Sequence, residues 1–323
     1  NSHDLPQTVT NHRYSVTIKV KPITGDHITT EELIAAIEST KVPEFPLREH
    51  EWVDDDYLLE LPIMDVHLGK LSWGEETRSG DYDLHIASDL YHDTISDLLD
   101  KVTLSSYPMA RVVFPIGQDF FHFDNPWVQT TGGTQLDSDT RWQKMYRTGV
   151  DLLLWAVEQC RMIAPVDVIW VPGNHDQVLS YTAVLTLKHF YNAIDDVTVD
   201  AGPTPRKYYR WGKNLIGYAH GREEGKRINT LMQLGDPVDW AETEYREWHM
   251  GDLHHEAARE EGGIMFRLIS SITSPDAWHA QKGYGGAIRK ASAFVWDKKN
   301  GLDAIFNSTV HSELYEEKEQ QDN

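Results

Sequence analysis

A chain of 323 residues, of which 40% are hydrophobic, can bury one large core or two modest ones and has neither a disordered nor a fibrous composition. Its 30 Lys and Arg residues against 51 Asp and Glu residues give a formal net charge of −21, which opposes broad, sequence-independent adhesion to a phosphate backbone because such binding depends on clustered cations. The single cysteine, Cys160, excludes an internal disulfide and a cysteine-based metal site.

The first 56 residues are predicted to form a small appended α+β element with a linker. Residues 12–23 alternate in hydrophobicity as a strand does, and TTEE at 29–32 has the spacing of a capping box that opens a short helix. The acidic, proline-containing run 39–56 is typical of a linker.

The sequence shows no membrane or secretion signal. No apolar run reaches the roughly 18 residues that a membrane span needs, and the polar start NSHDLPQTVT is unlike a signal peptide. We therefore expect a soluble, cytoplasmic protein with no membrane partner.

From Tyr57 onward, short apolar runs that end in polar residues alternate with helical patterns. The apolar runs are YLLELPIMDVH (57–67), ARVVFPIGQD (110–119), PVDVIWVPGNHD (165–176) and NLIGYAHG (214–221). Helical periodicity covers 83–102 and 140–163. A repeated strand and helix predict an α/β fold with a mostly parallel sheet and helices on its faces.

The chain after His254 changes to a β pattern. The runs 263–274 and 290–310 read as strands, with a turn at Lys299, Asn300 and Gly301, and we expect them to complete a second sheet layer. The charged tail 313–323 is expected to be mobile.

Potential metal ligands follow each of the four apolar runs. They are Asp65 and His67, then Gln118, Asp119 and His122, then Asn174, His175 and Asp176, and finally His220. Loops beyond the carboxyl ends of strands converge on one crevice in open α/β sheets. Carboxylate and imidazole ligands together suit Mn²⁺, Fe, Zn²⁺ or Ni²⁺. Two such ions about 3.5 to 4 Å apart are a catalyst for phosphate-ester hydrolysis.

Each of these residues also has a structural explanation when taken alone. Asp65 can cap a turn, Asn174 can hold the turn after Gly173, and His220 can be a hydrogen-bonded histidine at a strand end. Their joint order at four strand ends favours the metal site.

The same motifs resemble those of a known family. DVH, GQDFFH, GNHD, AHG and GDLHH are similar, in this order, to the D-x-H, G-D-x-x-H/D, G-N-H-D/E, later H and G-H-x-H motifs of the calcineurin-like metallophosphoesterases. The resemblance covers about 57–256 and implies a layered α/β/β/α sandwich, a domain that we place at 57–312. D-x-H-L-G at 65–69, D-F-F-H at 119–122 and the following Asn-Pro are similar to the nuclease subunit of double-strand-break repair complexes.

The resemblance implies a role for each matching residue. Asp65, His67 and His254 would hold the first metal, Asp119 would bridge, Asn174 and His220 would hold the second metal, His122 and His175 would contact the phosphate or protonate the leaving oxygen, and Asp176 would orient His175. It implies two divalent transition metals, with Mn²⁺ favoured over Fe, Zn²⁺, Ni²⁺ or Mg²⁺, and a homodimer or an ATPase partner.

Two positions depart from the family pattern. The G-D pair is one residue longer here, as Gly117, Gln118 and Asp119. Asp252 stands where the second metal normally finds an imidazole. We hypothesise that Asp252 binds the second metal more weakly and favours Mn²⁺ or Mg²⁺, with His255 as the alternative ligand.

These features predict two-metal hydrolysis of phosphate diesters, with a DNA exonuclease or endonuclease as the leading reading. The acidic charge favours an alternative, a phosphomonoesterase or a phosphodiesterase of small molecules or cyclic nucleotides. A third reading is a non-catalytic scaffold that kept the fold.

Several residues outside the motifs are candidates for substrate contacts. Arg222 and Lys226 are candidates for binding a phosphate, with solvated helix charges as the alternative. Trp73, Trp127 and Trp278 are candidates for stacking on a base, with core or rim packing as the alternative.

Overall fold

A computed structural model describes residues 56–310 of the chain. The predicted N-terminal element, apart from Asp56, and the predicted tail at 313–323 lie outside the described residues.

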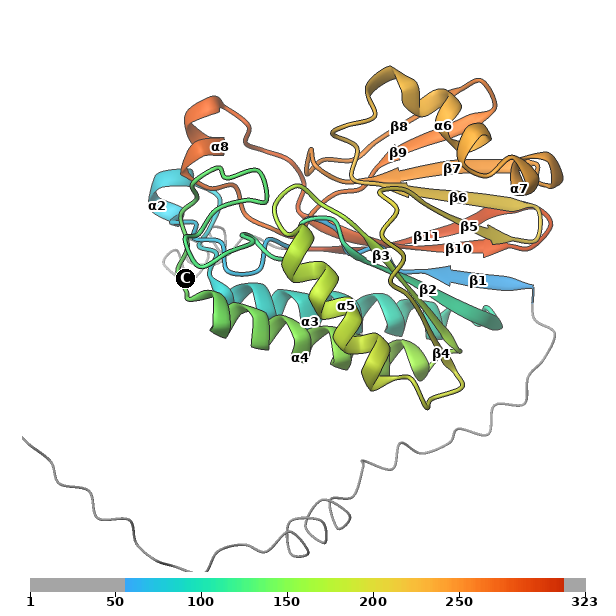
Figure 1. Ribbon diagram of the computed structural model, residues 1–323, viewed down its shortest axis with the longest axis horizontal. Helices are drawn as coiled ribbons and strands as arrows, with labels where there is room; N and C mark the ends of the chain where they lie inside the picture. The colour runs from blue at the N-terminus through green and yellow to red at the C-terminus, as the bar shows by residue number, and fades with distance from the viewer. Residues whose placement is uncertain (1–55, 311–323) are drawn as a thin grey trace, which may run out of the picture. The chain divides into compact units, whose positions relative to one another are not determined.

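The first sheet has six strands in the order β11-β10-β1-β2-β3-β4 (Figure 1). Their bounds are Tyr57–Glu60 for β1, Met109–Gly117 for β2, Val166–Val171 for β3, Val197–Asp200 for β4, Lys290–Asp297 for β10 and Gly301–Thr309 for β11. Strands β1 to β4 run parallel, as predicted. Strand β2 is buried on both faces, because Val112 packs toward the helices and Val113 toward the second sheet.

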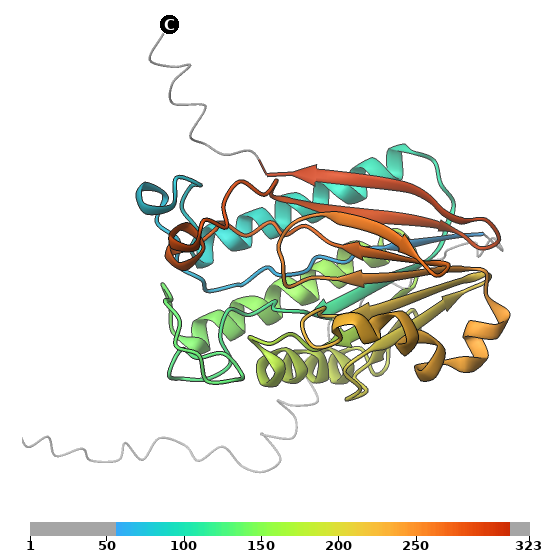
Figure 2. The same ribbon diagram turned by 90° about the horizontal axis from the view of Figure 1, so that it is seen from above.

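Three long helices cover the outer face of this sheet (Figures 1 and 2). They are α3 (Leu84–Leu104), α4 (Trp142–Arg161) and α5 (Gln177–Phe190), and the first two confirm the predicted helical runs. Helix α3 begins where the Asp83 carboxylate accepts a hydrogen bond from the backbone N of Ile86 at 2.8 Å.

The second sheet has five strands in the order β5-β6-β7-β9-β8. Their bounds are Lys207–Trp211 for β5, Asn214–Ala219 for β6, Tyr245–Met250 for β7, Ala257–Glu261 for β8 and Ile264–Leu268 for β9. Its outer face carries η1 (Gly225–Arg227), α6 (Ile228–Gly235) and α7 (Pro237–Glu242) (Figure 1). Ile216 and Tyr218 of β6 share a buried core with Leu58 of the first sheet, so the layers follow the predicted α/β/β/α order.

The C-terminal strands differ from the prediction. Of the two predicted runs, only 263–274 contributes a strand to the second sheet, as β9, whereas the run 290–310 forms the β10 and β11 hairpin that extends the first sheet beside β1. Strand β10 is apolar on both faces, since Val295 packs toward the helices and Trp296 into the core between the sheets. Such a strand needs an interior position. The predicted turn at 299–301 is confirmed, because the Asp297 carboxylate accepts from the backbone N of Lys299 at 2.7 Å.

Two short helices, α2 (Gly74–Thr77) and α8 (Ala277–Lys282), lie side by side at one end of the sheets (Figures 1 and 2). The arrowheads of β1 and β7 point toward this end (Figure 1). None of the helices between residues 56 and 310 combines the length and the apolar character that crossing a lipid bilayer requires.

Candidate metal centre

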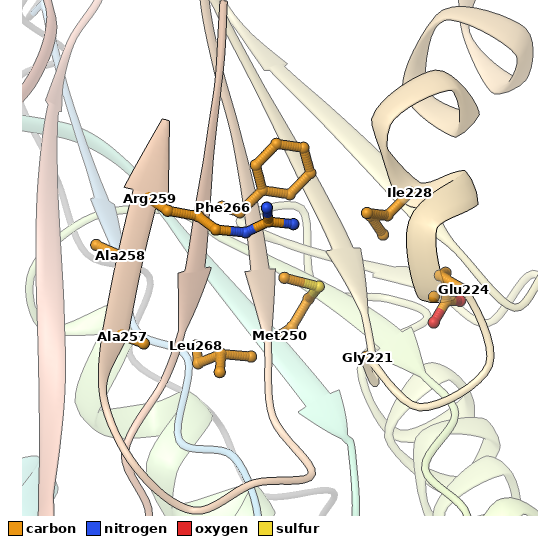
Figure 3. Close-up of a pocket in the computed structure, with 10 residues that line it drawn as sticks. Gly221, Glu224, Ile228, Met250, Ala257, Ala258, Arg259, Phe266 and Leu268 are labelled. Carbon is orange, nitrogen blue, oxygen red and sulfur yellow. The ribbon is translucent and has the colours of Figure 1, made fainter. Parts of the chain in front are cut away.

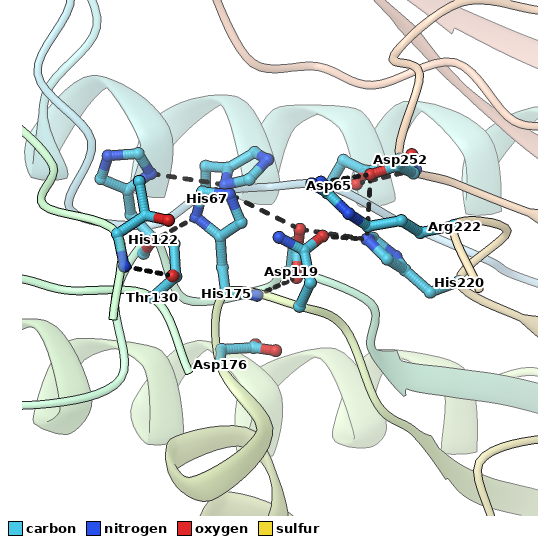
Figure 4. A network of polar contacts seen from close by, with 12 residues as sticks. Asp65, His67, Asp119, His122, Thr130, His175, Asp176, His220, Arg222 and Asp252 are labelled. Atoms are coloured by element: carbon cyan, nitrogen blue, oxygen red, sulfur yellow. Dashed lines mark hydrogen bonds and ion pairs between the residues drawn. The ribbon is translucent and has the colours of Figure 1, made fainter. Parts of the chain in front are cut away.

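The predicted ligands lie close together in the loops that follow the carboxyl ends of the parallel strands of both sheets (Figure 4). Loops after β1, β2 and β3 of the first sheet and after β6 and β7 of the second contribute, in chain order, Asp65 and His67, Asp119 and His122, Asn174 and His175, His220, and Asp252 and His254. Strand β1 already ends at Glu60, so Asp65 follows a short extended segment instead of closing the strand directly.

One group of donors gathers around His67. Its Nε2 lies 3.0 Å from Nε2 of His254. The His254 Nε2 is in turn 3.6 Å from Oδ1 of Asp65. Ligand atoms of these three residues all lie within 4.8 Å of one another, which is the spacing of a set that can surround one ion.

A second group gathers around His220. Its Nε2 lies 2.7 Å from Oδ1 of Asn174, 3.2 Å from Oδ2 of Asp119 and 3.5 Å from Oδ1 of Asp252 (Figure 4). Asp65 belongs with Asp119 and His220 as well as with the first group, because its carboxylate lies between the two. The structure therefore places the predicted ligands of both metals in one continuous cluster.

The backbone is strained at these positions. Of the nine non-glycine residues with positive φ within 56–310, six lie in the ligand loops, at Asp65, His67, Gln118, Asp119, Asp252 and His254, with φ between 49° and 67°. A left-handed conformation costs an L-residue of order 1 kcal/mol or more. The first two loops hold each other in this shape, since the backbone N of Asp65 donates to Gln118 O and that of His67 to Asp119 O, both at 2.9 Å.

Two motif glycines allow the ligand carboxylates to approach the backbone. A Cβ atom at Gly173 would lie 2.0 Å from Oδ1 of Asp119, and one at Gly251 would lie 2.3 Å from Oδ2 of Asp65. The backbone N of Asp252 also donates to the Asp65 carboxylate at 3.1 Å. The glycines of GNHD and GDLHH therefore leave the space that ligand carboxylates from neighbouring loops occupy.

His122 and His175 differ in how their ring nitrogens are used. His122 is buried, and its Nε2 donates to Asp137 O at 3.1 Å while its Nδ1 faces Nδ1 of His67 at 3.4 Å. His175 donates from Nδ1 to His122 O at 2.7 Å, which leaves its Nε2 facing Asp119 Oδ2 at 4.0 Å. The second histidine thus keeps a free nitrogen on the side of the cluster.

The predicted hydrogen bond from Asp176 to His175 is not formed within the described residues, and this role is corrected. The Asp176 side chain turns beneath the loop, where its Oδ2 accepts from the backbone N of Phe121 at 2.9 Å (Figure 4). His175 is oriented instead by the backbone carbonyl of His122. Asp176 therefore joins the loops after β2 and β3.

Burial and neighbouring charges set the protonation of the cluster. Burial, helped by His175 and His254, lowers the pKa of His67 well below its ordinary value, so the ring is neutral and offers a lone pair. Burial opposes charge on Asp119 and His220. Their mutual attraction prevails, lowering the pKa of Asp119 to about 2 and raising that of His220 well above its usual range.

This donor set fits divalent cations. Asp65 and Asp119 are buried carboxylates, and within 56–310 the only Lys or Arg ion pair of the cluster joins Arg222 Nη1 to Asp252 Oδ1 at 3.5 Å. The carboxylates favour the protonated, positively charged form of His220. Bound metal ions would compensate the same negative charge. Oxygen and imidazole donors of this kind suit Mn²⁺, Fe or Zn²⁺.

The remaining predicted site residues lie at different depths. Gln118 is buried, and its Nε2 donates to Ala219 O at 3.0 Å, so it joins the two sheets beside the cluster. His255, the alternative ligand, is exposed and turns to Leu253 O. Arg222 borders the cluster, whereas Lys226 is exposed in η1 and forms no ion pair within the described residues.

One histidine without a motif also borders the cluster. The His279 ring stacks on His254 with centroids 5.5 Å apart and planes at 23°. Its Nδ1 lies 2.7 Å from Oδ1 of Asp276, the residue that caps α8. The Asp276 and His279 spacing marks a helix start in the sequence, but only the tertiary fold brings that helix to His254.

A separate cleft of about 230 Å³ lies on the outer face of the second sheet, between η1 and the strands β7, β8 and β9 (Figure 3). Met250, Phe266 and Leu268 make its floor, with Arg259 and Glu224 at opposite sides (Figure 3). Gly221 and Glu224 of its lining belong to the loop that carries His220.

Comparisons with known proteins do not assign a family. No family model and no curated protein match the sequence. Solved structures similar to this chain include a predicted phosphoesterase from Streptococcus pneumoniae TIGR4, with 13% identity, 79% of this chain and 98% of that chain covered and a TM-score of 0.33. Another is an archaeal phosphodiesterase, with 7% identity, coverage of 79% and 99% and a TM-score of 0.36. Vps29 from Entamoeba histolytica complexed with Zn²⁺ has 11% identity, coverage of 79% and 98% and a TM-score of 0.32. At these values the likenesses carry no argument about activity.

Proposed function

We propose that this protein hydrolyses phosphate esters, with diesters preferred, at a centre that holds two divalent metals. One observation carries the proposal: carboxylate, amide and imidazole donors from five loops, far apart in the sequence, point at one another inside a single, largely buried cluster. The left-handed backbone at six positions of these loops supports it, since strain of this kind concentrates at functional sites.

The chain divides the donors between two cations. Asp65, His67 and His254 would hold the first, Asn174, His220 and Asp252 the second, and Asp119 would be shared. When bound, such a pair supplies Lewis-acid polarisation of the phosphoryl group and an acidified water. Asp252 gives the second position a harder ligand than imidazole, which favours Mn²⁺ there.

The histidines behind the ligands have distinct proposed tasks. His122 orients His67. Its Nε2 carries a proton, so its Nδ1 can accept a hydrogen bond from Nδ1 of His67. The Nε2 of a neutral His67 then carries a lone pair that is available to a metal. His175 presents Nε2 toward the cluster and is the better placed of the two to contact the phosphate or to protonate the leaving oxygen. Arg222, next to Asp252, is placed to bind a phosphate oxygen.

The finer choice of substrate rests on two opposing features. D-F-F-H at 119–122 and D-x-H-L-G at 65–69 resemble the double-strand-break repair nucleases and favour nucleic acid. The net charge of −21 favours small or short substrates over long duplexes. We propose nuclease-type diester cleavage on short or single-stranded substrates, with small-molecule diesters as the second candidate.

The test compares substrates side by side in Mn²⁺. Bis-aryl phosphate, mono-aryl phosphate, cyclic nucleotides, and single- and double-stranded DNA are assayed with the wild type, Asp119→Asn and the exposed control His85→Ala. Diester turnover that only Asp119→Asn abolishes supports the proposal. A protein that binds two metals and turns over none of these substrates is a scaffold, and the proposal fails.

A further inference from the structure

Large aromatic side chains stand exposed on α8 and the loop that follows it. Trp278 is 55% exposed and Tyr284 is 63% exposed, although aromatic rings of this size are usually well buried. Gly283, Gly285 and Gly286 have open space where a Cβ would lie, so the loop stands clear of the fold. These rings therefore have a free face.

Ring contacts connect this surface to the metal centre. Trp278 and Tyr284 have centroids 5.7 Å apart at 45°, and Trp278 meets His279 edge-on at 5.1 Å. His279 then stacks on His254, a proposed metal ligand. Trp278 is thus two ring contacts away from His254, and Tyr284 is three.

The helix that presents the rings is anchored to the first ligand loop. The Asp276 carboxylate accepts from the backbone N of His279 at 3.0 Å and pairs with the buried Lys70 Nζ at 3.4 Å. Lys70 lies three residues after His67. The neighbouring Ser72 hydroxyl donates to Pro275 O. Helix α8 is therefore fixed relative to the metal centre.

The same segment carries unneutralised positive charge. Lys282, exposed in α8, forms no ion pair with a carboxylate within the described residues. Arg289 instead points inward, where its Nε donates to Ile272 O at 3.0 Å, and Lys290 pairs with Glu256 at 2.7 Å. Lys282 lies one helical turn after Trp278 on α8, and a cation beside an exposed aromatic ring is the combination that binds single-stranded nucleic acid.

We propose that Trp278 and Tyr284 form a stacking subsite for an unpaired nucleobase beside the ester that the metal centre cleaves. The proposal rests on the proposed function and names its substrate as a diester with an accessible base. A duplex hides its ring faces within the stack, whereas an unpaired base presents both faces. Stacking on an aromatic ring changes affinity by about 10-fold to 100-fold per base.

The experiment uses two matched substrates, a short single-stranded oligodeoxynucleotide and the same oligonucleotide with abasic sites flanking the scissile phosphate. Wild type should cleave the base-bearing substrate with a kcat/KM about 10-fold to 100-fold higher. Trp278→Ala should remove most of this preference, Trp278→Phe should restore it, and Leu104→Ala, which truncates an exposed side chain on α3, should leave it unchanged. Equal loss on both substrates, or no preference in the wild type, overturns the subsite.

Two further measurements distinguish the stacking subsite from the proposed hydrolysis, on which it rests, and from a protein interface at the same surface. Binding of the two oligonucleotides by fluorescence anisotropy reports stacking without turnover, so base-dependent binding with no cleavage upholds the subsite and refutes the proposed hydrolysis. Cleavage without base dependence supports the proposed hydrolysis and refutes the subsite. The molar mass of wild type and Trp278→Ala in solution is the last arm, because a dimer that the substitution dissociates would make this surface a protein interface and overturn the proposal.

Discussion

The Nε2 atoms of His67 and His254 lie 3.0 Å apart, although 187 positions separate the two residues in the sequence. Two imidazole nitrogens lie this close only when a proton or a cation lies between them. His67 is oriented for this meeting by His122 on its other side, through an Nδ1 to Nδ1 distance of 3.4 Å. The pair is therefore a sensitive place to test for the first metal.

His254→Ala should lower the Mn²⁺ content from two ions per chain to one, because it removes one of the three donors that belong to the first position alone. Diester turnover should fall by 100-fold or more, since loss of a group that orients a metal already costs about 10-fold to 100-fold. Metal content after dialysis and the rate on bis-aryl phosphate are measured together. His85→Ala, at an exposed histidine on α3, is the matched control. Two retained ions in His254→Ala would contradict the assignment.

Asp252 lies where the family resemblance leads one to expect a histidine, and its Oδ1 is 3.5 Å from Nε2 of His220. Asp252→Ala should weaken the second Mn²⁺ site and leave the first intact. Asp252→His should restore two-metal binding and shift the preference toward Zn²⁺, because imidazole is the softer ligand. Titration calorimetry with Mn²⁺ and Zn²⁺ checks both. Unchanged affinity in Asp252→Ala would make His255 the ligand, although that side chain is exposed and turned to Leu253 O.

Gly173→Ala should damage the centre without removing any ligand atom. The new Cβ would lie 2.0 Å from Oδ1 of Asp119, so the carboxylate must move. We expect at least a 10-fold loss of diester turnover, since small misplacements of catalytic groups are costly. Gly132→Ala is the control, because its Cβ would meet only Thr130 Oγ1, at 3.9 Å. Equal activity of the two variants would show that the Asp119 position does not matter.

Much of the fold follows from local sequence signals. The apolar runs that became β2, β3 and β6 end where polar residues begin, and the helical runs became α3 and α4 with bounds close to those predicted. The rule that strand ends converge brings together residues as distant as Asp65 and His220. These predictions succeeded because a buried strand and an amphipathic helix each leave a pattern within a few residues.

Other features depend on contacts that no local pattern contains. The 290–310 hairpin joined the first sheet because both faces of β10 needed burial, a choice that depends on the space beside β1. The stacking of His279 on His254 depends on where α8 packs. The predicted role of Asp176 in orienting His175 was wrong, because its carboxylate accepts from the backbone N of Phe121, a contact between loops that the sequence does not reveal.

His249 is a further case, since it carries no motif yet lies fully buried between the sheets. Its Nδ1 lies 2.6 Å from Glu60 Oε1 and its Nε2 lies 3.0 Å from Glu247 Oε1. Arg267 also pairs with Glu247, and Trp296 donates to Glu60 at 2.8 Å. Burial opposes charge on this ring, but the Glu60 and Glu247 carboxylates together outweigh it and raise the pKa of His249 to about 9.

The raised pKa makes the stability of the protein depend on pH. A histidine has a pKa of about 6.5 in the unfolded chain, so the folded state binds its proton more tightly. The stabilisation is therefore complete below about pH 6.5 and is lost as the pH rises through about 9, with a total of about 3 kcal/mol. His249→Gln should destabilise the protein at pH 6 by about that amount more than at pH 10.

The measurement is urea unfolding of wild type and His249→Gln at several pH values between 6 and 10. The difference between the two free energies of unfolding isolates the histidine, because the other titrating groups are common to both chains. Work below pH 6 is avoided because His249 also lowers the pKa of Glu247, against the effect of burial, and that carboxylate loses its contribution in acid. If the difference between the two free energies of unfolding stays constant from pH 6 to pH 10, the buried His249 ring does not hold its proton and the prediction is wrong.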